Sequence, residues 1–296
     1  TIDPAGLPAD VLAERPQLAG MTALRLSAAD AARAPALLKG QLAVSLSGPD
    51  GRVRDSSGLQ LAGVLDDLFY FDGPLGVTWA GGAPTVRVWA PTAQSVSLLL
   101  FADANAPAPA QALPMTEEGG TWRLAGSADW KGRYYLYEVR VFVPATGKVE
   151  TNRVTDPCSV SLARNSTRSQ LLDLADPATA PAGWAALTLP PLAAPEDITI
   201  YELHVRDFSA LDPAVPQELR GTYQAFTLDT PATRHLRGLG QAGLSHIHLQ
   251  PVFDQATIDE DRAHWKDPGD LTPFPPDGEQ QQAAVAGVRD QDRTHV

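Results

Sequence analysis

The chain has 296 residues, a formal net charge of −12 at pH 7 and one cysteine, and 44% of its residues are hydrophobic. This acidic balance repels phosphate backbones and anionic lipid, so it argues against nucleic-acid and membrane-surface partners and is compatible with neutral ligands such as sugars. A single cysteine excludes an internal disulfide and a zinc site built from thiolates, and Cys158 is expected to be a small buried hydrophobe.

The length allows two or three domains. The 26 prolines and 24 glycines predict many short strands and loops. No run of about 18 apolar residues is present, so no transmembrane helix is expected. The sequence starts TIDPAGLPAD, without a methionine or a signal peptide, so either a leader was removed or the sequence is a piece of a longer protein.

Residues 1–66 are predicted to form a small β-rich segment. Strand-like runs at Gln41–Leu46 and Arg52–Asp55 flank a Pro-Asp-Gly sequence that favours a turn. Asp30–Leu38 is expected to form a short helical turn. The segment is too small for a whole sandwich and indicates only part of a β-domain.

Residues 67–178 have the pattern of an all-β unit. Strand-like runs read TVRVWAP, SVSLLLF, TWRLAG and GRYYLYEVRVFVP. In the last run, two-residue alternation places Tyr135, Tyr137 and Val139 on one face. Short strands at this spacing predict a β-sandwich. Residues 179–195 are rich in proline and alanine and predict a linker.

After residue 195 the sequence pattern changes from successive strands to strands that alternate with helices. DITIYELHVRDF is a predicted strand, and Thr230 and Pro231 suit the N-cap and first position of a helix that ends near Gly243. LSHIHLQPVFD is a second predicted strand, and a last helix is expected around Glu279–Arg289. A strand, helix and strand in this order imply parallel strands with a right-handed crossover.

Four ionisable residues lie at the end of the first of these strands: Glu202, His204, Arg206 and Asp207. Polar groups at the carboxyl end of a parallel strand are typical of the active-site face of an α/β barrel. The alternative is a structural, buried cluster of ion pairs and hydrogen bonds at the mouth of a barrel. We interpret the four residues in this second way and assign no catalytic residue.

A metal site is not expected. His246 and His248 alternate on one strand without an evident third ligand, so a buried histidine pair is the simpler interpretation. Acidic residues after this strand could form a calcium site or line a substrate, but they lack the spacing of a calcium loop, which favours a solvated acidic loop. These acidic residues are Asp254, Asp259, Glu260, Asp261, Asp267 and Asp270.

The motifs resemble those of pullulanase-type starch-debranching enzymes in the α-amylase superfamily, glycoside hydrolase family 13. YELHVRDFS and GLSHIHLQPVFD resemble the first two barrel strands of these enzymes. PTVRVWAPTAQSVSLLLF, WKGRYYLYEV and VTDPCSVSLARNSTRSQLLDL resemble carbohydrate-binding module 48 and the segment that follows it. LPADVLAERPQLAG and GVLDDLFYFDGPLG resemble the end of the upstream N2 domain.

The resemblance implies a multidomain fold, with all-β sandwich modules followed by the first βαβ portion of an incomplete (β/α)8 TIM barrel. It divides the chain into an N2-like part (1–66), a module-48-like sandwich (67–178), a linker (179–195) and the start of a truncated barrel (196–296). It also implies an enzyme that hydrolyses α-1,6 bonds in pullulan, glycogen and amylopectin, with calcium possible in the complete enzyme but no cofactor in this chain.

The catalytic acidic residues that hydrolyse the α-1,6 bond are expected to be absent from this chain. The family takes them from the fourth, fifth and seventh barrel strands, whereas about 100 residues follow Pro195 and a whole barrel takes about 250. After the DQD sequence, Arg293–Val296 depart from the family pattern. A natural truncation, a frameshift or a broken gene would each explain this, and a missing C-terminal catalytic portion is implied.

Sugar binding by the sandwich would use aromatic faces, and the candidates are Trp89, Trp130 and, by resemblance, Asn165. The exposed tryptophans of glycogen-binding family members fall near Tyr137 and near a loop without tryptophan, so weak or absent binding to α-glucan is expected. Three interpretations stay open: the N-terminal portion of a debranching enzyme, a glucan-binding module, or a subunit that completes a barrel with another polypeptide. The resemblance suggests a secreted or periplasmic bacterial protein.

Overall fold

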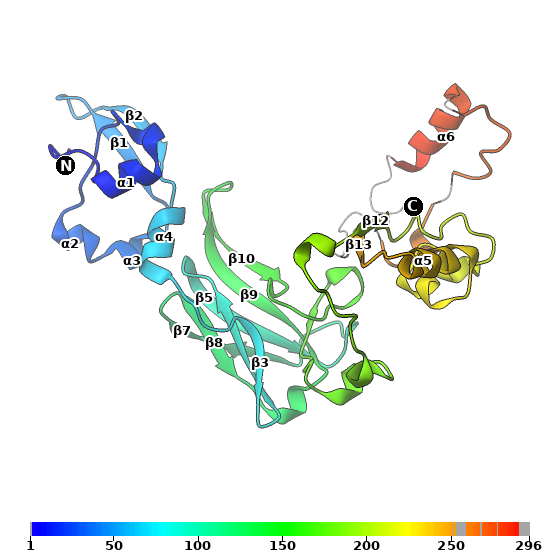
Figure 1. Ribbon diagram of the computed structural model, residues 1–296. Coiled ribbons are helices and arrows are strands. Elements are labelled where there is room, and N and C mark those ends of the chain that lie inside the picture. Colours follow the sequence, from blue (N-terminus) through cyan, green and yellow to red (C-terminus); the bar gives the residue numbers. More distant parts are fainter. Residues whose placement is uncertain (1, 251, 253–258, 267, 277, 290–296) are drawn as a thin grey trace. The chain divides into compact units, whose positions relative to one another are not determined.

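The computed structural model describes residues 2–250, 252, 259–266, 268–276 and 278–289. The chain divides into two compact units, Thr1–Asp173 and Leu174–Val296, which are considered separately (Figure 1). Within the described ranges, every helix is too short or too polar to cross a membrane.

The start of the first unit mixes short helices with one hairpin. The predicted hairpin is confirmed as an antiparallel pair with a glycine at φ +73 in its turn, Gly51, a conformation that favours glycine. The expectation of a β-rich segment is wrong, because alanine-rich runs form helices here. The elements are α1 (Ala9–Glu14), η1 (Pro16–Leu18), α2 (Ala28–Ala31), α3 (Ala34–Leu37), β1 (Ala43–Ser47), β2 (Val53–Gly58) and α4 (Ala62–Phe69).

Two antiparallel sheets follow and confirm the predicted all-β module. One sheet has the order β3-β4-β8-β7 and the other β10-β9-β5-β6, with β11 also paired to β9. The strands are β3 (Gly76–Ala80), β4 (Ala83–Trp89), β5 (Ala93–Phe101), β6 (Gln111–Pro114), β7 (Thr116–Glu118), β8 (Thr121–Ala125), β9 (Tyr134–Val143), β10 (Lys148–Val154) and β11 (Ser169–Gln170). Short 3-10 turns lie at η2 (Ala128–Trp130) and η3 (Arg164–Ser166).

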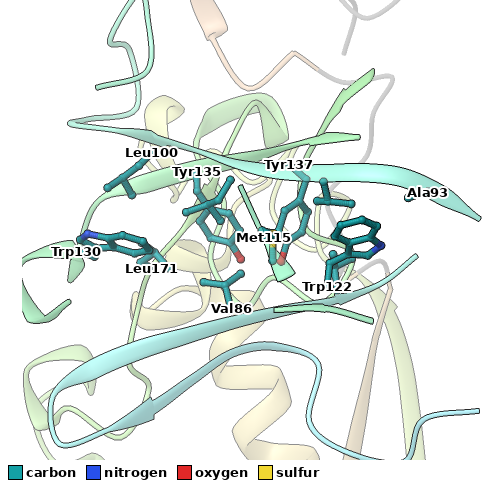
Figure 2. Packing of buried hydrophobic residues seen from close by; sticks show 12 residues of the cluster. Val86, Ala93, Leu100, Met115, Trp122, Trp130, Tyr135, Tyr137 and Leu171 are labelled. Atoms are coloured by element: carbon teal, nitrogen blue, oxygen red, sulfur yellow. The ribbon is translucent and has the colours of Figure 1, made fainter. Parts of the chain in front are cut away.

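The core lies between these sheets (Figure 2). Val96, Leu98 and Leu100 alternate along β5 toward the core, as a two-residue period requires. Tyr135 and Tyr137 alternate along β9 and are fully buried, which confirms their predicted shared face. Figure 2 shows both rings reaching from β9 into the space between the sheets.

The second unit contains a parallel strand pair, as the strand-helix-strand order predicts. Glu202 pairs with His248 in the register of β12 and β13. The elements are η4 (Pro177–Thr179), η5 (Trp184–Ala186), η6 (Pro195–Asp197), β12 (Ile200–His204), η7 (Gln217–Leu219), η8 (Tyr223–Thr227), α5 (Pro231–Gln241), β13 (His246–Gln250), η9 (Arg262–His264) and α6 (Glu279–Arg289).

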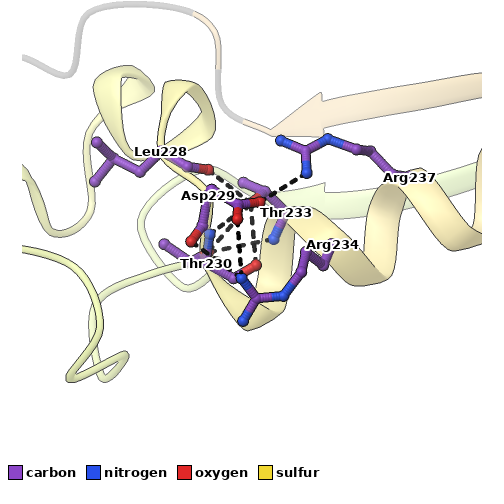
Figure 3. A network of polar contacts seen from close by, with 6 residues as sticks. All are labelled: Leu228, Asp229, Thr230, Thr233, Arg234 and Arg237. Carbon is purple, nitrogen blue, oxygen red and sulfur yellow. Dashed lines mark hydrogen bonds and ion pairs between the residues drawn. The ribbon is translucent and has the colours of Figure 1, made fainter.

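Helix α5 begins where the sequence predicts (Figure 3). Thr230 and Thr233 form a capping box, in which each side chain accepts a hydrogen bond from the other residue's backbone N–H, at 3.3 and 2.9 Å. The side chain of Asp229 accepts hydrogen bonds from Arg237 at 2.8 Å and Arg234 at 3.1 Å, and these bonds lower the pKa of Asp229. Local hydrogen bonds thus define the start of this helix.

Candidate functional site

Trp130 lies in the core of the sandwich. Its side chain packs with Leu171 and Leu100, and the residue is 6% exposed (Figure 2). Trp122 is also 6% exposed, and its indole N–H donates to the carbonyl of Ala90 at 3.0 Å. Because a sugar ring stacks on an open aromatic face, the burial of Trp130 does not suit the stacking role that the sequence predicts for it.

Trp89 is half-buried at the end of β4. Its indole N–H donates to the carbonyl of Phe69 at 2.8 Å, so the polar edge of the ring is occupied within the chain. Tyr134 is also half-buried. Between residues 74 and 173, all of which the structure describes, every aromatic residue is buried or half-buried. Between these two positions the sandwich therefore presents no fully open aromatic platform, whereas Tyr70, four residues before this range, is 78% exposed.

Asn165 is exposed in a strained loop. It and Ser166 have φ values of +56 and +53, a left-handed conformation that is uncommon for residues other than glycine. The nearby Arg168 guanidinium lies 3.8 Å from the centre of the Phe101 ring and donates to the carbonyl of Asp103 at 2.8 Å. The Asn165 loop is thus held against the loop after β5, with Asn165 on the surface.

A buried carboxylate that the sequence analysis missed joins the sheet to the segment after β10. Asp156 is 4% exposed, and its Oδ2 accepts hydrogen bonds from the hydroxyls of Tyr135 at 2.7 Å and Tyr137 at 2.9 Å. Its backbone N–H donates to Ser169 at 2.9 Å. Burial, and then the Asp156 charge, raise the pKa of both tyrosines far above the ordinary value.

A sequence signal for this network exists. Two inward tyrosines on one strand need a buried acceptor for their hydroxyls, and Asp156 is an acidic residue just after the next strand, β10. Cys158 lies beside it, and its backbone N–H donates to Asp156 Oδ1 at 2.8 Å. The residue itself is exposed, so its expected burial is wrong. Its position in a turn after β10 leaves it at the surface.

The strand-end residues form ion pairs within the second unit. Glu202 and His248 lie 2.8 Å apart on neighbouring strands, and Arg206 lies 3.0 Å from Asp207. His204 accepts a hydrogen bond from the backbone N–H of Arg206 at 3.1 Å. The predicted burial of this cluster is wrong, because these five side chains are 40–62% exposed.

The histidine and acidic residues do not assemble a metal site in the described part of the chain. No group of three histidine, cysteine or acidic side chains able to hold a metal is found there. His246 is exposed and contacts Ser245 at 2.9 Å, so a buried histidine pair is also wrong. The two-stranded sheet leaves both histidines uncovered.

In the acidic loop, Asp259 pairs with His264 at 2.7 Å. Asp261 accepts from the backbone N–H of Ala263 at 3.1 Å, and Glu260 is exposed. Hydrogen bonds from Thr272 lower the pKa of Asp270. Asp254 and Asp267 lie outside the described residues.

Comparison with known proteins shows which domain models and which relatives this chain matches. The pullulanase N2 domain model matches residues 1–67, and the model for carbohydrate-binding module 48, the isoamylase N-terminal domain, matches residues 74–159. Pullulanase 1, chloroplastic, of Arabidopsis thaliana is 38% identical over 291 residues, which are 97% of this chain and 30% of that protein. A Klebsiella pneumoniae pullulanase is 38% identical over 253 residues, which are 83% of this chain and 23% of that protein.

Solved structures give the same correspondence. Klebsiella pneumoniae pullulanase complexed with maltotriose matches with a TM-score of 0.84 and 35% identity, covering 99% of this chain and 29% of that chain. Paenibacillus barengoltzii pullulanase in complex with maltohexaose and α-cyclodextrin matches with a TM-score of 0.58 and 33% identity, over 69% and 31% of the two chains. This chain spans less than a third of these relatives' length. The chain is therefore similar to the N-terminal region of pullulanases, with one match to their N2 domain followed by one match to carbohydrate-binding module 48.

Proposed function

We propose that this chain is the N-terminal, non-catalytic portion of an enzyme that hydrolyses α-1,6 bonds in pullulan, glycogen or amylopectin. Residues 1–66 form its N2 part, residues 67–178 its module-48 sandwich, residues 179–195 a linker, and residues 196–296 the start of a (β/α)8 barrel. The observation that carries this proposal is the match of 99% of the chain to 29% of a pullulanase. The parallel pair β12–β13 with α5 supports the assignment of a barrel start.

Catalysis by this chain alone is not expected. Retaining glycoside hydrolysis needs two carboxyl groups about 5–5.5 Å apart across the scissile bond. Within the described residues, β12 and β13 form the one parallel pair, and Glu202 and Asp207 at the end of β12 are engaged with His248 and Arg206. We assign these residues a structural role and place the catalytic acids in barrel strands outside this chain.

The purified 296-residue chain is expected to release no reducing sugar from pullulan above the background of a heat-denatured sample. The physical reason is that both carboxylates of the reaction are missing. A reducing-sugar assay with a full-length pullulanase as positive control measures this. Turnover that survives Glu202→Gln and Asp207→Asn would show that other acids of this chain catalyse hydrolysis, and turnover that either variant removes would assign catalysis to the strand-end cluster; both results contradict the proposal.

A second candidate function is α-glucan binding by the sandwich. The module-48 match favours it, and two related structures were solved with maltotriose or with maltohexaose and α-cyclodextrin. The absence of a fully exposed aromatic residue between positions 74 and 173 favours weak binding. We infer that any binding involves the exposed loop of Asn165, with Trp89 offering only part of its ring.

Affinity electrophoresis in amylopectin is expected to slow the chain only slightly. Asn165→Ala should remove this retardation, because the variant loses an exposed amide that can hydrogen-bond a sugar hydroxyl. Asn105→Ala, another exposed loop asparagine, is the matched control and should leave mobility unchanged. Retardation that Asn165→Ala does not alter would place binding elsewhere, and no retardation at all would remove this second function.

Another polypeptide is the alternative partner of this chain. A barrel start that lacks the catalytic strands could instead complete a barrel with another polypeptide, and recovery of activity on mixing with the C-terminal part of a pullulanase would favour that alternative. We propose a secreted or periplasmic location in a bacterium; the Klebsiella relatives support a bacterial source, whereas the Arabidopsis thaliana relative is chloroplastic.

A further inference from the structure

The N2 part contacts the sandwich first through Lys39. Its ammonium lies 2.7 Å from the carboxylate of Glu117, and the two side chains are 21% and 37% exposed. The same ammonium lies 5.5 Å from the centre of the Trp122 ring. The backbone carbonyl of Lys39 accepts a hydrogen bond from Gln94 at 3.0 Å, and Gln94 in turn accepts one from Arg140 at 2.6 Å. The side chain of Lys39 thus contacts β7 and its backbone contacts β5.

A second contact forms at the end of α4, the helix that joins the N2 part to the sandwich. Phe69 is 8% exposed, and its carbonyl accepts the indole N–H of Trp89. Gly120 lies against it with φ +84, and a Cβ at this position would lie 2.8 Å from the Cβ of Phe69. Nearby, the Arg87 guanidinium lies 5.0 Å from the centre of the Phe71 ring. The turn between β7 and β8 therefore fits closely around Phe69.

The segment between these contacts has little core of its own. Every residue of β1 and β2 is exposed, including Leu46 at 65% and Val53 at 61%. An isolated two-stranded hairpin is at best marginally stable in water. The folded state of the β1–β2 hairpin must therefore be stabilised mainly by the contacts at the two ends of the segment, at Lys39 and at Phe69.

We infer that the patch of the sandwich formed by Gln94, Glu117, Gly120 and Trp89 is a docking surface whose partner is the N2 part of the same chain together with α4, the helix that joins the N2 part to the sandwich. The two docking points, Lys39 and Phe69, lie on either side of residues 40–68. The hairpin β1–β2 is thus fixed to the sandwich at both ends of this segment. The N2 part and the sandwich, which match two separate domain models, then form one cooperative unit. This inference does not depend on the proposed hydrolytic role.

Hydrogen exchange of the full 296-residue chain tests the inference. In Lys39→Glu the amides of β1 and β2 should exchange about tenfold faster, as expected when a charged hydrogen bond is replaced by like charges. The amides of β5 and β9 should be unchanged. Gly120→Ala disturbs the second docking point and should accelerate the same hairpin peptides, which provides an independent variant.

Two further variants separate docking from a general charge effect. The swapped pair Lys39→Glu with Glu117→Lys should restore most of the hairpin protection. Arg54→Glu reverses the charge of the exposed Arg54–Asp50 pair in the same hairpin and should change exchange by less than about twofold. Unchanged exchange in Lys39→Glu, failure of the swap to restore protection, or an equal effect of Arg54→Glu would each overturn the inference.

Discussion

Asp156→Ala is expected to lower the free energy of unfolding of the sandwich by roughly 3–5 kcal/mol. The substitution leaves the hydroxyls of Tyr135 and Tyr137 without their common acceptor, and both tyrosines are fully buried. Each buried donor that loses its partner costs about 1–3 kcal/mol. The variant also removes the bond that holds the backbone N–H of Cys158, so the turn after β10 should loosen.

Urea unfolding followed by tryptophan fluorescence measures this effect, because Trp122 and Trp130 report on the same core. Asp103→Ala is the matched control. Asp103 is exposed, and its side chain accepts a local hydrogen bond from the backbone N–H of Asn105, so loss of this side chain should cost less than about 1 kcal/mol. Tyr137→Phe should lower the free energy of unfolding by less than Asp156→Ala and by more than Asp103→Ala. Equal unfolding midpoints for Asp156→Ala and Asp103→Ala would show that the buried network adds little stability.

Amides of the sandwich, residues 67–178, are expected to exchange far more slowly than those of residues 196–296. The core strand β5 contains Leu98 and Leu100, both fully buried, whereas β12 and β13 are almost entirely exposed. Local opening free energies range from near zero in exposed segments to the global value in core strands. The protection of β5 should therefore exceed that of β12 by a factor on the order of a thousand or more.

Hydrogen exchange with mass spectrometry on the whole chain gives both values in one experiment. Helix α5 is an internal comparison, since its capping box should protect it more than the neighbouring strands but less than β5. Similar protection of β5 and β12 would contradict the prediction. It would show that the second unit is stabilised by interactions beyond the two-stranded sheet.

Features with short-range causes were predictable. The alternation of Tyr135 and Tyr137 gave their shared face, and the Pro-Asp-Gly sequence gave the hairpin turn. Thr230 and Pro231 gave the start of α5, because a cap needs only neighbouring backbone N–H groups. The motifs of the sandwich and of the two parallel strands gave the relationship to pullulanases, which the comparisons confirm.

Burial and long-range pairing were decided by the tertiary structure. A tryptophan suits a core or a sugar platform equally well in sequence, and only the packing of the two sheets shows that Trp130 is a core residue. Asp156 became a key acceptor because the chain after β10 folds back onto β9, and Lys39 became a docking residue because a strand 78 positions away supplies Glu117. The ionisable residues of β12 stayed exposed because their burial requires covering elements, which a local pattern cannot supply.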